Sequence, residues 1–450
     1  MGRSAGEHEA AILEEEERRA SAPLPVRLET ITRALAWARA AGDAAWTARA
    51  LYSRGWVLRL AGRLEDAARD LDEAYGFAHA RESAAFIAAV ATEMGSVASL
   101  RGDLEAARAR LLEALALAED DAPPPGALGN LGMVEAELGL LGAAERRYRE
   151  ALAAARRHEA SDASRGTTMM NLANVRMEQG ALDEAEALLK GALELHSGCG
   201  DRLFEGICIG NLGNLRFLEG ALDEGEGCFR SALALHEALG FAQGEGHYGA
   251  GLGATLARQG RLDEAADAFV RSKRRLEEAS APALLLTHEL QEGFLDLARG
   301  EAALARVRLR AAEREPRLGM AARMVAKLLA AELNAPFEPR AWDPGPRRLR
   351  VARDGSRFEL GRARADLTRR RVPRALLVAL VEGRLHRAGQ ALPLSELVAA
   401  GWPGERIRPD AAANRLYVAL STLRKLGLGP VLYTRNDGYL LDPETEIELL

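Results

Sequence analysis

The stretch Gln179-Gly-Ala-Leu-Asp-Glu-Ala185 decides the fold, because the chain repeats it at a fixed spacing. Near copies begin at Glu219 and Gln259, each forty residues further along the chain. The glycine of this motif recurs at Gly62, Gly102, Gly139, Gly180, Gly220, Gly260 and Gly300. A repeat of this length is typical of a solenoid, in which each helical pair buries its apolar face against the next pair.

Two further positions keep a constant distance from these turn glycines. Seven residues before the glycine stands a tiny residue, at Gly55, Gly95, Gly132, Ala173, Gly213, Gly253 and Gly293. Nine residues after it stands a bulky one, at Leu71, Leu111, Tyr148, Leu189, Phe229, Phe269 and Leu309. We expect each turn glycine to end the first helix of a pair in the left-handed conformation. The bulky side chain should then fill the space beside the tiny residue, so that the two helices pack closely.

These spacings resemble the tetratricopeptide repeat, in a longer variety of about forty residues. Gly213, Gly220, Phe229 and Ala232 follow one another at the intervals of that family. The resemblance covers roughly residues 28–315. It implies that residues 23–315 form a superhelical solenoid of about seven repeats, whose first helices line a concave groove for a peptide or protein partner.

Asparagines recur beside the tiny residue in three adjacent repeats, at Asn130, Asn171, Asn174, Asn211 and Asn214. In tetratricopeptide proteins, asparagines at these positions often hold a peptide backbone. The amide side chain both donates and accepts hydrogen bonds, so it can bind an extended peptide without requiring a particular sequence. We therefore predict that these five residues bind a peptide. In the alternative interpretation, they cap local structure or face solvent.

The two ends of the array are predicted to differ from its repeats. Residues 1–22 are charged and poor in large apolar groups, which indicates a disordered acidic tail. Residues 316–346 predict one further helix that caps the array, followed by a proline-rich linker that ends at Pro344-Gly-Pro346. Residues 444–450 contain three glutamates and are predicted to form a second acidic tail.

Between this linker and this tail, residues 347–443 show a different pattern. Alternating residues around Leu349 and Phe358 predict a hairpin with Asp354-Gly355 at its turn. Three helical segments follow, and a second hairpin is predicted with Asp437-Gly438 near its turn. Strands, three helices and a terminal hairpin come in the order expected of a winged helix-turn-helix. The fold class is therefore predicted as mainly α, a solenoid followed by a small α+β winged-helix domain.

Three stretches in this region resemble the DNA-binding domain of OmpR/PhoB-type response regulators: Leu394-Ser-Glu-Leu397, Ser421-Thr-Leu-Arg-Lys425 and Thr434-Arg-Asn-Asp-Gly-Tyr439. The resemblance implies that the long helix over residues 410–426 enters the major groove and that Arg435 in the wing touches the DNA backbone or minor groove. The chain departs from that family at Asn414, where an arginine is usual. The repeat array also stands where a receiver domain would be.

The phase of the long helix, at about 100° per residue, separates its buried face from its free face. Leu416, Leu420 and Leu423 form the predicted buried stripe. Polar and basic residues that can meet base edges and phosphates lie opposite or at the helix end. With the wing arginine, the predicted DNA-binding residues are Asn414, Arg415, Val418, Ser421, Thr422, Arg424, Lys425 and Arg435.

Charge is distributed unevenly in a way that supports a polyanionic partner at this end. Residues 345–450 carry 19 Lys/Arg against 12 Asp/Glu, a net charge of +7, while residues 1–344 carry a net charge of −13. A basic module joined to an acidic body is the balance expected when one end of a chain meets nucleic acid.

Several classes of function are excluded by what the sequence lacks. It contains no phosphate loop, zinc motif or paired nucleophile and base, so we expect neither an enzyme nor a cofactor. The glycine-rich run 249–253 falls on a repeat helix, follows no strand and precedes no Lys-Ser/Thr pair. Three cysteines form no even disulfide framework, and neither a signal peptide nor a membrane span is apparent, which indicates a cytoplasmic protein.

The sequence therefore predicts a transcriptional regulator. Its array would sense a peptide or protein, and its winged helix would bind double-stranded DNA, with occlusion, orientation or homodimerisation as the means of control. The alternative is an interaction scaffold without DNA binding, in which the array and the winged helix both dock proteins.

Overall fold

The computed structural model describes residues 24–450 apart from short gaps at 82, 118–122, 158–159, 316, 335–347, 362, 388, 406–408, 430, 436–437 and 443–444. The predicted N-terminal tail and most of the predicted linker therefore lie outside the described residues. The chain divides into two compact units. The first joins the residues up to 131 with those from 344 onward, and the second contains residues 132–343.

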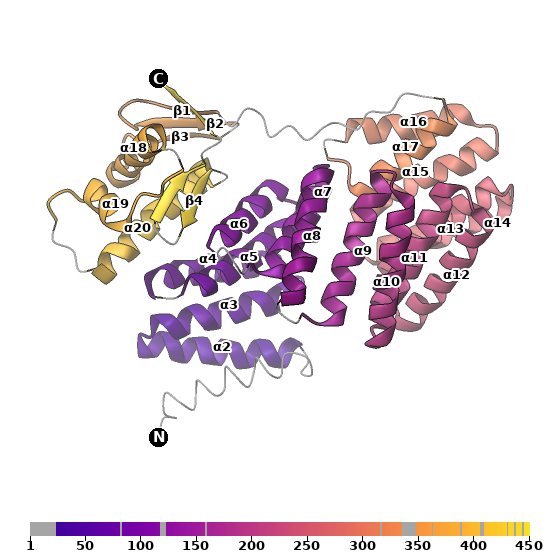
Figure 1. Ribbon diagram of the computed structural model, residues 1–450, viewed down its shortest axis with the longest axis horizontal. Helices are drawn as coiled ribbons and strands as arrows, with labels where there is room; N and C mark the ends of the chain where they lie inside the picture. Colours follow the sequence, from indigo (N-terminus) through magenta and orange to yellow (C-terminus); the bar gives the residue numbers. More distant parts are fainter. Residues whose placement is uncertain are drawn as a thin grey trace. The chain divides into compact units, whose positions relative to one another are not determined.

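Helices in antiparallel pairs build the array (Figure 1). Those before the unit boundary are α2 (Leu24–Ala41), α3 (Ala44–Leu60), α4 (Leu64–Arg81), α5 (Ala84–Leu100) and α6 (Leu104–Leu117), and α7 (Pro125–Glu137) contains the boundary. The second unit continues with α8 (Leu141–Arg157), α9 (Asp162–Glu178), α10 (Leu182–Gly198), α11 (Arg202–Glu219), α12 (Leu222–Leu239), α13 (Ala242–Arg258), α14 (Leu262–Glu278), α15 (Pro282–Ala298), α16 (Ala302–Arg314) and α17 (Met320–Glu332).

All seven turn glycines adopt the predicted left-handed conformation, with φ between 73° and 81°. A side chain at such a position would be strained, which explains why glycine recurs there. Helices α10 and α12 begin two residues after Gly180 and Gly220, and each has an Asp-Glu pair in its first turn. Negative charge is favourable at the positive end of a helix, so the motif both ends one helix and stabilises the start of the next.

The tiny and bulky positions meet as predicted. A Cβ built on Gly213 would lie 2.9 Å from the ring of Phe229, which is completely buried. Gly95 meets Leu111 in the same way, with 2.6 Å between the built Cβ and Leu111 Cγ. The last repeat differs, because the space beside Gly293 is taken by Leu329 of α17, 2.7 Å from the built Cβ.

Helix α17 packs against α15 and α16 and also reaches α9. Its Arg323 donates to both carboxylate oxygens of Glu178 at 2.8 Å and to the backbone carbonyls of Ala136 and Glu137 at 2.6 and 2.9 Å. Helix α17 therefore contacts the C-terminal ends of the first helices α7 and α9. It also follows α16, where the sequence predicts a helix that caps the array.

First helices of successive pairs also contact one another: α11 packs against α9 and α13, and α13 packs against α15. The second helices α10, α12 and α14 pack mainly against these first helices. The first helices of the second unit therefore form a continuous layer, along which the sequence predicts a groove.

The C-terminal region is a small α+β structure. Its four-stranded sheet has the order β3-β2-β1-β6, in which β1 is antiparallel to β2 and parallel to β6. A separate antiparallel hairpin joins β4 and β5. The strands are β1 (Arg348–Val351), β2 (Arg357–Leu360), β3 (Ala363–Asp366), β4 (Leu432–Arg435), β5 (Gly438–Leu441) and β6 (Glu446–Leu449). The helices are α18 (Arg371–His386), α19 (Leu394–Gly401) and α20 (Pro409–Leu423), followed by a π-helical turn η2 (Arg424–Leu428).

The C-terminal residues 444–450 differ from the acidic tail predicted for them. Glu446–Leu449 forms β6, whose acidic side chains face the basic ones of β1. Arg348 lies 3.0 Å from Glu446, and Arg350 lies 3.3 Å from Glu448. Alternating charges of opposite sign thus pair across two parallel strands, which gives these glutamates a structural role.

The predicted fold class is confirmed at the level of a mainly helical repeat solenoid followed by a small strand-containing region. Across the described part of the chain, none of the helices combines the length and the apolar character that crossing a bilayer requires.

Candidate nucleic-acid interface and peptide groove

Helix α20 has the two faces that its phase predicts. Leu416, Leu420 and Leu423 are buried in the core of the C-terminal region. Val418, on the opposite side, is 63% exposed, and Lys425 is also exposed. Single exposed valines are normal on helices, so the exposure of Val418 shows only that this face points away from the core.

The remaining predicted residues of this face lie around Val418. Arg415 is exposed and forms an ion pair with Glu405 at 3.0 Å, which solvent screens. Ser421 and Thr422 are half-buried, and the Thr422 hydroxyl donates to the Val418 carbonyl at 2.8 Å. Asn414 lies on α20 and Arg435 at the end of β4, but their side chains lie outside the described part.

Arg424 is placed differently from the other predicted DNA-binding residues. Its side chain is only 6% exposed, and Nη2 donates to Glu113 Oε1 at 3.1 Å and to the Leu432 carbonyl at 3.2 Å. A guanidinium that is buried against a carboxylate cannot reach a DNA groove in this arrangement. The helical phase places Arg424 beside Tyr417, whose hydroxyl donates to the Asp72 carbonyl at 3.0 Å.

Four of the predicted peptide-binding asparagines lie on first helices of the second unit, on α9 and α11. Asn171 and Asn214 are half-buried, with no side-chain hydrogen bond shown within the described structure. Asn211 is buried and its Oδ1 accepts from the Tyr248 hydroxyl at 3.1 Å. Asn130 belongs to the first unit, where its amide donates to Ser96 Oγ at 2.9 Å.

Asn174 carries the least satisfied polar atom of this set. Its Oδ1 is buried and has no hydrogen-bond partner within the described part of the chain. An amide oxygen removed from water without a partner costs free energy, so such atoms usually have a ligand or a water bound to them. Asn174 therefore fits a residue that accepts a hydrogen bond from a bound molecule.

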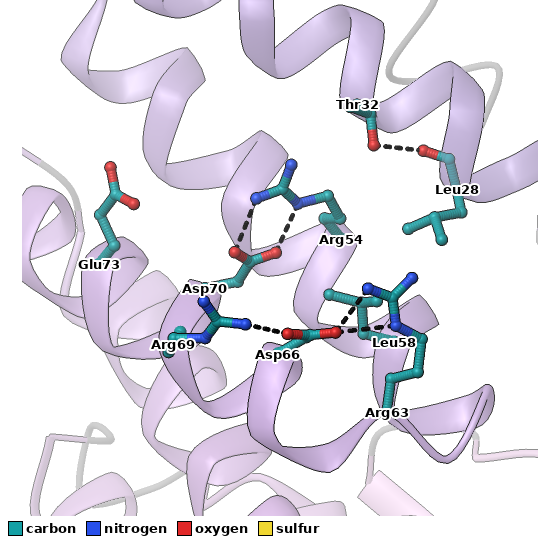
Figure 2. A pocket seen from close by; sticks show the side chains of 9 residues that line it. All are labelled: Leu28, Thr32, Arg54, Leu58, Arg63, Asp66, Arg69, Asp70 and Glu73. Carbon is teal, nitrogen blue, oxygen red and sulfur yellow. Dashed lines mark hydrogen bonds and ion pairs between the residues drawn. The ribbon is translucent and has the colours of Figure 1, made fainter.

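A pocket of about 440 Å³ opens between α2, α3 and α4 (Figure 2). Five of its charged side chains pair with one another: Arg54 Nη2 donates to Asp70 at 2.7 Å, and Arg63 and Arg69 both donate to Asp66. The sixth, Glu73, pairs with Arg39, which does not line the pocket. Because these opposite charges are matched inside the pocket, it offers no net field for a charged ligand. We therefore do not place the functional site there.

Two buried histidines, His196 and His236, stand at the same position of adjacent repeats and pack against the glycines Gly166 and Gly206. Burial lowers the pKa of His236, so this side chain is neutral at pH 7. Within the described ranges, no group of three or more histidine, cysteine or carboxylate side chains is placed to hold a metal ion. Repeat packing accounts for these histidines.

Comparisons with known proteins bear on the array. Residues 164–238 match the family model of the tetratricopeptide repeat. No curated protein sequence matches the chain. The structure of a Rap protein complexed with competence and sporulation factor is 15% identical over 73% of this chain and 91% of its own, with a TM-score of 0.56. The apo form of RapI is 12% identical over 60% of this chain and 99% of its own, with a TM-score of 0.50.

A Rap conjugation gene regulator of the plasmid pLS20, in complex with the Phr* peptide, is 12% identical over 73% of this chain and 96% of its own, with a TM-score of 0.46. At such identities a likeness shows the fold alone. Residues 164–238 therefore match tetratricopeptide repeats, and the fold of the array is similar to that of the Rap protein.

Proposed function

We propose that this protein is a DNA-binding transcriptional regulator whose repeat array binds an extended peptide or a protein segment. The observation that carries the proposal is the outer face of α20. It presents the exposed Val418 between the basic side chains of Arg415 and Lys425, while three leucines on its other side anchor it in the core. A small apolar residue flanked by cations suits a major groove, where it meets thymine methyl groups and phosphates.

The elements around α20 support the same function. Helices α18 and α19 pack against α20, and the β4–β5 hairpin follows it, as in a winged helix-turn-helix domain over the proposed residues 347–443. Leu392 bridges to Tyr439 and so fixes the hairpin beside the helices. Residues 345–450, which include this region, carry a net charge of +7, and a positive charge favours binding to the phosphate backbone of DNA.

The array supports a peptide partner. Asn171, Asn174 and Asn214 lie on the neighbouring first helices α9 and α11, and the buried Asn174 Oδ1 has no hydrogen-bond donor among the described residues. The Rap protein with the similar fold holds a bound factor, competence and sporulation factor. We place the proposed peptide clamp on α9 and α11 and do not include Asn130, whose amide already donates to Ser96.

Replacing the two basic residues of the exposed α20 face tests the DNA-binding part. We expect Arg415→Ala with Lys425→Ala to weaken binding of the full chain to a labelled duplex by about tenfold at low salt, because each lost cation leaves one phosphate unneutralised. Fluorescence anisotropy measures the dissociation constant. The matched control is Arg348→Ala, which removes an exposed arginine of β1 from the same module. Equal affinities of the double variant and the control would favour the scaffold alternative.

Replacing the clamp asparagines tests the peptide-binding part. We expect Asn171→Ala with Asn214→Ala to reduce recovery of peptides from a random-sequence library by about tenfold, since each lost hydrogen bond contributes about 1 kcal/mol. Recovery on the immobilised full chain is quantified by mass spectrometry. Asn130→Ala serves as the control because it removes an asparagine at the equivalent repeat position in the first unit. The clamp is refuted by unchanged recovery with the double variant.

A further inference from the structure

Within the first unit, the C-terminal module packs against the early repeats. Helix α20 contacts α4, and strand β4 contacts α6. Two side chains make the specific contacts, Tyr417 of α20 and Arg424 at the start of η2. They meet Asp72, Tyr75 and Gly76 of α4 and Glu113 of α6, which together are called the docking surface below.

Gly76 is shaped for Tyr417. A Cβ built on Gly76 would lie 2.6 Å from Cε1 of the Tyr417 ring, so only glycine leaves room for it. Glycine weakens the interior of a helix, and its presence in the middle of α4 needs a reason. The other repeats carry a side chain at this position, fourteen residues after the turn glycine, at Ala116, Ala153, Glu194, Ala234, Arg274 and Arg314.

Tyr75 is a second departure from the repeat pattern. The equivalent position holds a leucine in the next four repeats, at Leu115, Leu152, Leu193 and Leu233. Tyr75 is buried, its ring centroid lies 5.9 Å from that of Tyr417, and its hydroxyl donates to Glu113. The first repeat thus carries two residues that depart from the repeat pattern and that Tyr417 of the C-terminal module contacts.

Glu113 joins the two parts by charge. Its side chain is 3% exposed, and it receives Arg424 at 3.1 Å and Arg110 of its own helix at 2.9 Å. The Arg424 guanidinium also lies over the Tyr75 ring, 5.8 Å from its centroid. A buried carboxylate between two arginines keeps both in place, because either charge left alone would be unfavourable.

The docked side of α20 borders its proposed DNA face. At about 100° per residue, Tyr417 and Arg424 point roughly a quarter turn away from Lys425 and Val418. A helix about 10 Å across fills the major groove, which is about 12 Å wide and has a phosphate backbone on each side. Another helix packed about 8 to 10 Å from its axis would occupy the space of one of these backbones.

We propose that the docking surface of α4 and α6 holds α20 in a state that excludes DNA, so that the early repeats inhibit the DNA-binding module of the same chain. The exclusion of DNA rests on the proposed DNA-binding function, whereas the docking of α20 on α4 and α6 does not. The contact itself is independent of what α20 binds. Release of Tyr417 and Arg424 from the docking surface would then be the step that permits DNA binding.

The test enlarges Gly76 without touching the C-terminal module. In the full chain, Gly76→Leu should raise amide hydrogen exchange over residues 415–425 by about tenfold or more, because the docked state is blocked. It should also tighten binding to a labelled duplex by about tenfold or more, since the competent fraction of the chain increases. Gly76→Ala, which favours the helix, should act in the same direction. Ala153→Leu, at the exposed equivalent position of α8, is the control.

Each outcome bears on one half of the proposal. Faster exchange with tighter DNA binding supports both halves. Faster exchange without DNA binding by any variant supports docking and refutes the proposed DNA function. Faster exchange with unchanged, measurable DNA affinity overturns the exclusion of DNA. Exchange that does not differ between both Gly76 variants and the Ala153→Leu control overturns docking, whatever the DNA affinity.

Discussion

Glu113→Ala is expected to destabilise the first unit by about 3 to 5 kcal/mol, because it leaves buried cations without their counter-charge. Arg424 is 6% exposed and depends on Glu113, and Arg110 pairs with the same carboxylate. Burial, followed by the charge of Glu113, also raises the pKa of Tyr75 well above its ordinary value, so this hydroxyl stays protonated and donates to the carboxylate. Native-state hydrogen exchange of the α5 and α6 amides reports the free energy of unfolding.

The control for this prediction occupies the same position one repeat earlier. Glu73 also pairs with an arginine, Arg39, at 2.7 Å, but the two side chains are 42% and 48% exposed. Because exposed ion pairs contribute little, Glu73→Ala should cost about 1 kcal/mol or less. A similar loss for both variants would mean that the pairing of Glu113 with Arg110 and Arg424 contributes no more than a surface contact.

Arg323→Ala is expected to have the largest effect in the second unit, again about 3 to 5 kcal/mol. Arg323 ties α17 to the ends of α7 and α9, and its partner Glu178 has a side chain only 2% exposed. Removing the guanidinium takes both of its hydrogen bonds from that buried carboxylate and leaves the exposed ammonium group of Lys327 as its cation. It also removes the donor to the backbone carbonyls of Ala136, Glu137 and Leu318. Urea denaturation of the full chain, combined with hydrogen exchange of the α17 amides, measures the loss.

Lys327 provides the comparison, because it contacts the same carboxylate from one turn further along α17. Its ammonium group lies 3.3 Å from Glu178, but the side chain is 43% exposed. Lys327→Ala should therefore cost about 1 kcal/mol or less. If the two variants proved equally stable, α17 would be held by its apolar side chains alone, chiefly Leu329 against Gly293.

The solenoid could be predicted from the sequence because each structural demand appears seven times. A left-handed turn requires glycine, and a close helix crossing requires a tiny residue opposite a bulky one, so each pattern can be read at fixed intervals. Gly213 and Phe229 show how directly this becomes a contact. The faces of α20 were predictable for a similar reason, since three leucines at helical spacing define what is buried.

Contacts between distant segments could not be predicted in this way. Arg323 and Glu178 are separated by 145 residues, and no periodicity relates them. The pairing of β6 with β1 joins two strands of only four residues, which are too short for a pattern to specify. Arg424 was predicted to bind DNA because it matches the end of the recognition helix in OmpR/PhoB-type domains. That resemblance contains no information on what packs against the helix from another part of the chain.

One signal for the docked arrangement was present in the sequence all the same. Tyr75 and Gly76 depart from the residues that most other repeats carry, and a glycine in the middle of α4 does not favour the helix. A residue that breaks a repeat without serving it indicates a contact outside the repeat. For the asparagines the sequence showed positions but not their partners. The structure shows that Asn130 and Asn211 already have a hydrogen bond, whereas Asn174 Oδ1 has none to the part of the chain that the structure describes.

The salt dependence of DNA binding tests the central claim most directly. Binding of the wild-type chain and of Gly76→Leu to a labelled duplex is measured between about 50 and 200 mM salt. We expect the logarithm of the binding constant to fall linearly with the logarithm of the salt concentration, and Lys425→Ala to make that slope shallower by about one. Absence of binding by both chains at the lowest salt, or a binding constant that salt does not change, would contradict the account.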